Sequence, residues 1–123
     1  MPRMRKNAVA FSAYVTEDCK QLMEFLIERE ELSQVVFIRK AVRKFLEGDR
    51  KIDERILIKR GEPHYVRRSA LVSSYIDLTQ KGELEKTAKE QGSNFSQAFF
   101  QAILSYCAFL ITIDDTGIEI RRR

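Results

Sequence analysis

The chain has 123 residues, of which 44% are hydrophobic, so it can form a buried core in one domain or in two very small ones. Lys and Arg exceed Asp and Glu by 22 to 18, and the resulting net charge of +4 permits nucleic acid as a partner without requiring it. The single histidine, His64, excludes a His-rich zinc site, and no uninterrupted apolar run of about 18 residues indicates a membrane span.

The first predicted element is a strand that includes FSAYV, residues 11–15. Alternation with period two directs one set of side chains towards a core and the other set outward. The core set is Phe11, Ala13 and Val15, and the outward set is Ala10, Ser12 and Tyr14. The pattern predicts a sheet with one buried face and one face that is available for another role.

Two helices are predicted after this strand. Thr16 is a suitable N-cap for the first helix, and the acidic residues Glu17 and Asp18 suit the positive end that follows. Ser33 is a suitable N-cap for the second helix, and Gly48 is a suitable stop signal. The apolar stripes of the two helices are Cys19, Leu22, Met23, Leu26 and Ile27, and then Phe37, Ile38, Ala41, Val42, Phe45 and Leu46.

The same order of elements is predicted again 61 positions later. VSSYI, residues 72–76, corresponds to FSAYV, and its predicted outward residues are Leu71, Ser73 and Tyr75. Gly92 is expected to end the next helix, and Asn94 or Ser96 to cap the last one. One strand leaves two edges unpaired and one copy has too little core, so we expect the two copies to fold together.

Residues 49–69 connect the two copies and are long for a loop inside a compact domain. ILI, residues 56–58, is typical of either a short strand or a helical segment, and Gly61 and Pro63 indicate a turn. The tail, residues 111–123, is predicted to form a hairpin that bends near 115–117.

Four residues of the last helix lie outside its main apolar stripe and need to be covered. They are Phe100, Leu104, Cys107 and Ile111. Strands from the connecting segment and the tail are the first candidates to cover them. A homodimer contact through the second copy or the tail is the alternative.

Catalysis and cofactors have no signal in the sequence. It contains no Gly-rich phosphate loop, no Ser–His–acid set with usable spacing and no cluster of metal ligands, so we expect neither an enzyme nor a cofactor. Cys19 and Cys107 lie in apolar helical patterns and are expected to be buried free thiols. Such thiols suit a reducing, intracellular location, and no signal-peptide pattern opens the sequence.

The pattern as a whole resembles the ribbon-helix-helix family of transcription regulators. FSAYVT with LSQVVFIRKAVRKFL, and VSSYID with SNFSQAFFQAILSY, carry the resemblance. In that family two chains normally give one strand each to an antiparallel ribbon, whereas this chain supplies both strands. It looks like the tandem regulators that archaeal viruses encode, which would place it in the host cytoplasm.

The resemblance implies a mainly α-helical fold with a two-stranded antiparallel ribbon. Residues 8–48 and 70–110 would form an intramolecular pseudo-dimer, and the connecting segment and tail can add a small β-hairpin. The resemblance also implies that the outward residues of the ribbon contact base edges in the major groove of double-stranded DNA. These residues are Ala10, Ser12, Tyr14, Leu71, Ser73 and Tyr75.

These six residues differ from the usual chemistry of the family, which commonly has Arg, Lys, Asn, Gln or Thr there. Such residues discriminate between bases by roughly 1–3 kcal/mol each, whereas Ser, Tyr, Ala and Leu make weaker base contacts. We therefore expect modest direct readout, with DNA shape and backbone contacts adding to it. An exposed strand face without a ligand, or one that packs under another segment, is the alternative interpretation.

For phosphate contacts, the resemblance points to the start of the second helix in each copy, where free N–H groups and the helix dipole favour an anion. The matching residues are Ser33, Gln34, Val35, Asn94, Phe95 and Ser96. Arg5, Lys6, Arg67 and Arg68 precede the two strands and are further candidates for phosphates that flank the groove. Solvated basic residues without a partner are the alternative.

The sequence thus predicts a transcription regulator that binds double-stranded DNA with sequence selectivity. The first alternative is a protein-interaction module of the antitoxin type, although the tail is shorter than the partner-binding extensions of antitoxins with this fold. The second alternative is an architectural DNA-binding protein with weak sequence preference, which the weak outward residues favour.

Overall fold

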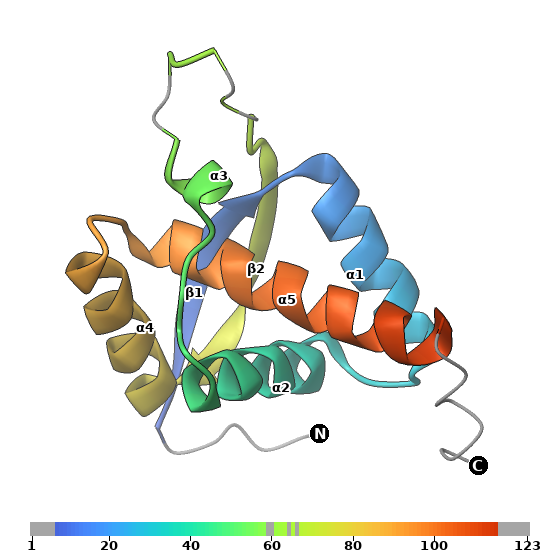
Figure 1. Cartoon of the computed structure of the whole chain (residues 1–123). Helices are drawn as coiled ribbons and strands as arrows, with labels where there is room; N and C mark the ends of the chain where they lie inside the picture. Colours follow the sequence, from blue (N-terminus) through green and yellow to red (C-terminus); the bar gives the residue numbers. More distant parts are fainter. Residues whose placement is uncertain (1–6, 59–60, 64, 66, 116–123) are drawn as a thin grey trace.

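The computed structural model describes residues 7–58, 61–63, 65 and 67–115, and within them the fold is mainly helical with one two-stranded antiparallel sheet (Figure 1). The helices cover one face of the sheet (Figure 1). The elements in chain order are β1 (Ala8–Val15), α1 (Glu17–Arg29), α2 (Gln34–Glu47), α3 (Glu54–Leu57), β2 (Ala70–Asp77), α4 (Leu78–Glu90) and α5 (Phe95–Asp115).

The two strands pair along their whole length, from Ala8 opposite Asp77 to Val15 opposite Ala70. The face towards the helices buries six apolar side chains, and Ser74 on the same face is half-buried. The six are Phe11, Ala13, Val15, Ala70, Val72 and Ile76. The predicted alternation of the strands is therefore confirmed, since the opposite face is left outward.

Helices α1 and α2 begin at the predicted caps. The Thr16 hydroxyl accepts a hydrogen bond from the backbone N–H of Cys19 at 3.1 Å, and the Ser33 hydroxyl accepts one from the N–H of Val36 at 3.1 Å. Gly48 is the C-cap of α2, as predicted. The buried side chains of these helices are those of the predicted stripes, namely Cys19, Met23, Leu26, Phe37, Ile38, Ala41, Val42 and Phe45.

The bounds of the helices recur with the sequence offset. Helix α4 begins and ends 61 residues after α1, and α5 begins 61 residues after α2. The loops recur as well, because Glu31 and Gly92 occupy corresponding positions and both have positive φ angles, 56° and 69°. In each loop the residue that follows the positive-φ position donates its backbone N–H to the carbonyl five residues earlier. Leu32 donates to Ile27, and Ser93 donates to Ala88.

The first part of the connecting segment, residues 49–58, folds against the start of α5 (Figure 1). Its one helical turn, α3, buries Ile56, and Ile52 just before it is also buried. Three glutamines hold its backbone. Gln91 accepts from the N–H of Ile52 at 2.9 Å, Gln101 accepts from the N–H of Asp53 at 2.6 Å, and Gln97 donates to the carbonyl of Ile56 at 3.0 Å. ILI is thus helical at its start, and no strand forms there.

The predicted tail hairpin is wrong where the structure describes it. Residues 111–115 continue α5, because Cys107 and Leu110 are buried and extend the helix beyond the length of α2. The remainder of the predicted hairpin, residues 116–123, lies outside the described residues. Helix α5 therefore continues through residues 111–115, where the tail hairpin was expected to begin.

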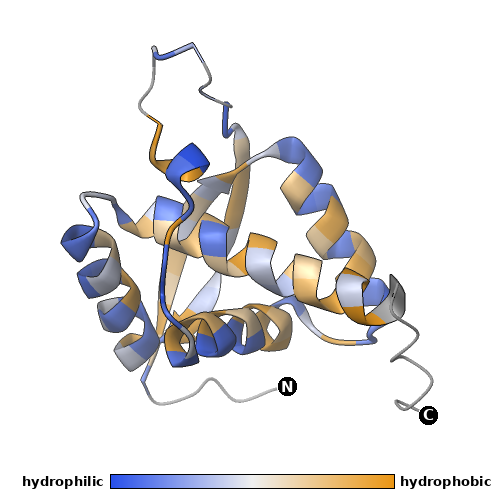
Figure 2. Ribbon diagram, viewed as in Figure 1, coloured by the Kyte–Doolittle hydropathy of each residue, from blue (hydrophilic) through white to orange (hydrophobic). Residues whose placement is uncertain are grey.

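The connecting segment covers the second apolar side of α5 at Phe100, whereas Cys107 lies near Cys19 of α1. Phe100 and Cys107 are buried, while Leu104 and Ile111 are half-buried. Figure 2 shows α5 as mostly apolar and α4 as mostly hydrophilic, so α5 is the central helix of the core. The predicted cover by the connecting segment is confirmed at Phe100, where it comes from a helical turn and Arg68 instead of a strand.

By length and composition alone, one helix of the described residues, Phe95–Ile113 in α5, is apolar enough to cross a membrane. Core helices of globular proteins pass the same test. Phe99, Ala102 and Ile103 of this helix are buried against the rest of the fold, which is the behaviour of a core helix.

Candidate nucleic-acid interface

The predicted outward residues of the ribbon form three cross-strand pairs, and a fourth pair on the same side, Ala8 opposite Asp77, is half-buried at the strand end. Ala10 lies opposite Tyr75, Ser12 opposite Ser73, and Tyr14 opposite Leu71. All six side chains are exposed, and the larger ones keep much of their surface in solvent: 51% for Tyr14, 43% for Leu71 and 44% for Tyr75. The structure therefore brings together all six residues predicted to contact bases, and among the residues that it describes no segment packs over them.

Hydroxyl groups occupy the centre of this face. The Oγ atoms of Ser12 and Ser73 lie 2.9 Å apart in a hydrogen bond in which either can be the donor. One hydroxyl proton is used in this bond, so the pair offers one donor and its remaining lone pairs to a ligand. No charged side chain and no amide belongs to the six residues. The face can therefore make apolar contacts and a few hydroxyl hydrogen bonds.

The start of α5 lies beside one end of the ribbon face. Asn94 is exposed and its side-chain oxygen caps the helix by accepting from the N–H of Gln97 at 3.0 Å. The Phe95 ring is stacked at a centroid distance of 6.2 Å on Phe99 and contacts Phe11 edge-on at 5.6 Å. The side chain of Phe95 thus belongs to the core, and only its backbone N–H is suited to an anion.

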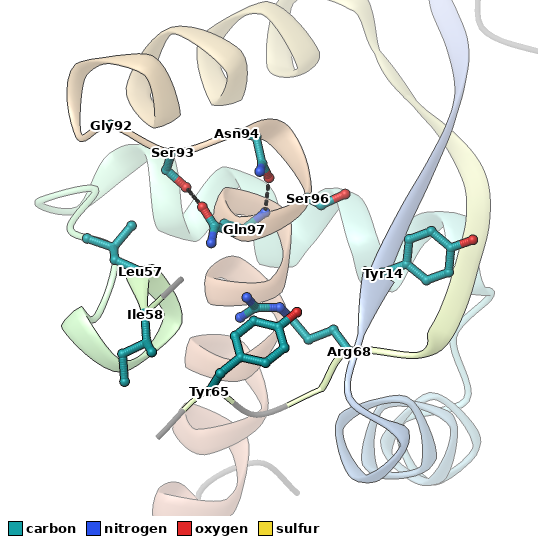
Figure 3. Close-up of a pocket in the computed structure, with 10 residues that line it drawn as sticks. All are labelled: Tyr14, Leu57, Ile58, Tyr65, Arg68, Gly92, Ser93, Asn94, Ser96 and Gln97. Carbon is teal, nitrogen blue, oxygen red and sulfur yellow. Dashed lines mark hydrogen bonds between the residues drawn. The ribbon is translucent and has the colours of Figure 1, made fainter. Parts of the chain in front are cut away.

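A hollow of about 470 Å³ opens between the ribbon, the start of α5 and the connecting segment. Figure 3 shows Tyr14 at one side of it, Asn94, Ser96 and Gln97 on the first turn of α5, and Arg68 beside Tyr65. Ser93 and Gln97 are hydrogen-bonded to each other at its rim. The hollow is polar and open, which suits a solvated anionic group more than an apolar ligand.

The start of α2 occupies the corresponding place in the other half of the chain. Ser33 is exposed and caps the helix, while Gln34 and Val35 are half-buried in its first turn. Helix α2 packs against β2 as α5 packs against β1. Each strand of the ribbon therefore rests on a helix whose capped end carries the predicted phosphate residues.

The basic residues before β2 differ in their surroundings. Arg67 is exposed and available to a ligand, whereas Arg68 is half-buried. The Arg68 guanidinium donates to the carbonyl of Ile56 at 3.3 Å and lies 5.2 Å from the ring centroid of Tyr65 and 5.5 Å from that of Phe100. Arg68 therefore helps to hold the connecting segment. Arg5 and Lys6 lie outside the described residues.

Sequence reasoning missed several residues at the hollow. Tyr65, Ser93 and Gln97 line it, although none was singled out. Only the position of Ser93 and Gln97 next to the predicted cap at Asn94 could have indicated them. Tyr65 reaches the site because the connecting segment folds back on α5, and no local pattern in the sequence announces that fold.

Other kinds of chemistry have little support in the described residues. Burial raises the pKa of the Cys19 thiol to about 12, with a smaller contribution from Cys107, and burial raises that of Cys107 to about 11. Both thiols are therefore protonated at neutral pH and poor nucleophiles. No group of three or more His, Cys, Asp or Glu side chains suited to a metal ion occurs in the part of the chain that the structure describes.

Comparisons of the chain with protein-family models, with curated proteins and with solved structures found no match.

Proposed function

We propose that this protein is a double-stranded DNA-binding transcription regulator that inserts its ribbon into the major groove. In this proposal the two halves of the chain, residues 8–48 and 70–110, form a single-chain ribbon-helix-helix pseudo-dimer. The observation that carries the proposal is the outward ribbon face, where six exposed side chains from both strands lie beside the capped start of a helix.

The dimensions of the ribbon favour the major groove. Paired strands lie about 4.8 Å apart, and side chains on the outward face add to that width. The major groove of B-DNA is about 12 Å wide and admits a two-stranded ribbon, whereas the minor groove is about 6 Å wide. The six outward residues would then face base edges.

Charge complementarity favours an anionic partner, such as duplex DNA, over a neutral or basic one. None of the six predicted base-contact residues is acidic, although Asp77 ends β2 on the same side of the strand; the exposed Arg67 precedes β2, and the chain carries a net charge of +4. The capped starts of α2 and α5 add the positive ends of two helix dipoles. Phosphates on both sides of the groove would bind there, through backbone N–H groups near Ser33 and Asn94.

A second candidate function is that of an architectural protein with little sequence preference. It is favoured by the absence of Arg, Lys, Asn and Gln from the ribbon face, since these residues make the strongest base contacts. Both candidates predict affinity for duplex DNA that falls as salt increases. They differ in whether one sequence is preferred.

Selection from a pool of random duplexes, at low and moderate salt, tests the proposal. Enrichment of a motif by the natural chain, and its loss in the double variant Tyr14→Ala, Ser73→Ala, would support a sequence-selective regulator. Retention of DNA without an enriched motif would favour the architectural function. Failure to retain duplex DNA at low salt would contradict both, and a search for a protein partner would follow.

A further inference from the structure

The following inference rests on the proposed function. The composition of the ribbon face limits which features of a base pair it can recognise. Of its six side chains, Ala10 and Leu71 are purely apolar, and Tyr14 and Tyr75 present rings. The two serines partly satisfy each other through their 2.9 Å hydrogen bond. The face has no group able to make the bidentate hydrogen bonds that distinguish guanine or adenine.

We infer that the ribbon recognises the C5-methyl groups of thymine, through apolar contacts made by Leu71 together with the tyrosine rings. The thymine methyl is the apolar feature of the major-groove edge of the standard base pairs. An exposed leucine gains nothing from a polar base edge, since it can neither donate nor accept a hydrogen bond. Against a methyl group, both partners lose apolar surface to water, which favours binding.

The two ends of the face differ in how well they can make such a contact. Leu71 corresponds in the repeat to Ala10, and each lies opposite a tyrosine. The Tyr14–Leu71 end therefore offers two large side chains, exposed by 51% and 43%, while the Tyr75–Ala10 end offers one. We expect the stronger preference for thymine at the Tyr14–Leu71 end.

Two synthetic duplexes isolate the methyl group. One is an alternating adenine–thymine duplex, and the other has uracil in place of every thymine, so that the two differ in the C5-methyl groups. We expect the natural chain to bind the thymine duplex more tightly, by about fourfold for each methyl group that is fully buried. A second pair of duplexes, alternating guanine–cytosine with and without 5-methylcytosine, should show the same direction of change.

Two matched substitutions separate contact by the protein from an effect of methyl groups on the DNA itself. Leu71→Ala removes the larger apolar side chain, and Ala10→Leu adds one at the corresponding position of β1. Both positions are exposed, so neither change disturbs the core. The ratio of affinities for the thymine and uracil duplexes should fall towards one in Leu71→Ala and rise in Ala10→Leu.

The outcomes distinguish failure of this inference from failure of the proposed function. Equal affinity of the natural chain for both duplexes would overturn methyl recognition and leave DNA binding intact. A ratio that is the same in all three proteins would also overturn it, because the preference would then come from the DNA alone. Absence of binding to every duplex at low salt would overturn the proposed function and this inference together.

Discussion

Ser12 and Ser73 face each other across the ribbon, with their Oγ atoms 2.9 Å apart, and they are corresponding residues of the two halves of the chain. When two antiparallel strands are related by a two-fold axis, a residue lies opposite its counterpart in the other strand only where the axis passes between the two. In the proposed pseudo-dimer, the two-fold axis would pass between the two serines. Positions on either side of it exchange partners, so that Tyr14 lies opposite Leu71 and Tyr75 opposite Ala10.

Substitutions at Glu31 and Gly92, which occupy corresponding loops, are expected to change the free energy of unfolding in opposite directions. Both residues have positive φ, which glycine adopts without cost and a residue with a Cβ does not. Gly92→Ala should lower the free energy of unfolding by about 1 kcal/mol, although nothing lies within 4 Å of an added Cβ. Glu31→Gly should raise it by up to about 1 kcal/mol. Urea denaturation measures both.

Gly82, inside α4, is the matched control for these glycine changes. An added Cβ at Gly82 also meets nothing within 4 Å, but the backbone there is helical. Gly82→Ala should therefore stabilise the protein by about 1 kcal/mol, because alanine is the better helix former. If Gly82→Ala and Gly92→Ala shift the free energy of unfolding in the same direction, the conformational argument is wrong.

A negative charge at the start of α5 should weaken DNA binding without loss of stability. Asn94→Asp is nearly isosteric and keeps the N-cap, since Asp caps a helix as well as Asn does. If a phosphate binds at this helix start, repulsion should reduce affinity for duplex DNA several-fold at low salt and less at high salt. Fluorescence anisotropy with a labelled duplex measures the affinity, and thermal unfolding checks the fold.

Lys40→Gln is the control for this charge change, because Lys40 is exposed in the middle of α2 and its replacement lowers the net charge by the same amount. It should reduce affinity by less than Asn94→Asp does. Equal losses in the two variants would mean that only the total charge matters, and the proposed phosphate site at α5 would have to be abandoned.

Because of the two buried thiols, the free energy of unfolding is expected to fall at alkaline pH. Their pKa values rise on folding, from 9.0 to about 12 for Cys19 and to about 11 for Cys107. Their contribution is fully present below pH 9 and is lost as the pH rises towards these folded values, because only the unfolded thiols ionise in that range. Each thiol should lower the free energy of unfolding by up to about 1.4 kcal/mol per pH unit.

Chemical denaturation between pH 8 and pH 11 measures this dependence. The double variant Cys19→Ala, Cys107→Ala will be less stable throughout, because it loses buried atoms. Its free energy of unfolding should nevertheless fall less steeply with pH than that of the natural chain. Parallel curves for the two proteins would show that lysine and tyrosine side chains cause the loss, and that the thiols do not.

The side chain of Gln91 is expected to stabilise the start of the connecting segment. Its side chain accepts from the N–H of Ile52 at 2.9 Å and donates to the carbonyl of Arg50 at 2.6 Å. Gln91→Ala leaves two partly buried backbone groups without these partners, which should cost about 1–3 kcal/mol. Hydrogen exchange at residues 50–53 should become faster. Gln21→Ala, on the exposed side of α1, is the control and should change neither quantity.

The parts of the fold that the sequence predicted are those governed by local patterns. Alternation at FSAYV and VSSYI predicted both faces of the ribbon, and Thr16, Ser33 and Asn94 predicted three helix starts. These features depend on neighbouring residues and on the solvent. The six outward residues of the candidate site were predicted for the same reason.

The parts that the sequence did not predict depend on contacts between distant residues. Gln91, Gln97 and Gln101 hold a segment about 40 residues away along the chain, and no spacing rule links an amide side chain to a remote backbone group. The sequence predicts a hairpin for the tail because TIDDTGIEI alternates like a strand, whereas packing of Leu110 in the core keeps residues 111–115 helical. Glu31 gave no sign of its positive φ.

Both strands of the ribbon belong to one chain, and this affects how the surface of the ribbon can evolve. In a ribbon built from two identical chains, a codon change alters both strands at once, so the surface must stay symmetric. Here each strand has its own codons, and Ala10 and Leu71 already differ at corresponding positions. Selection can therefore change one end of the ribbon while it preserves the other, and a DNA target of the proposed regulator would not need to be a palindrome.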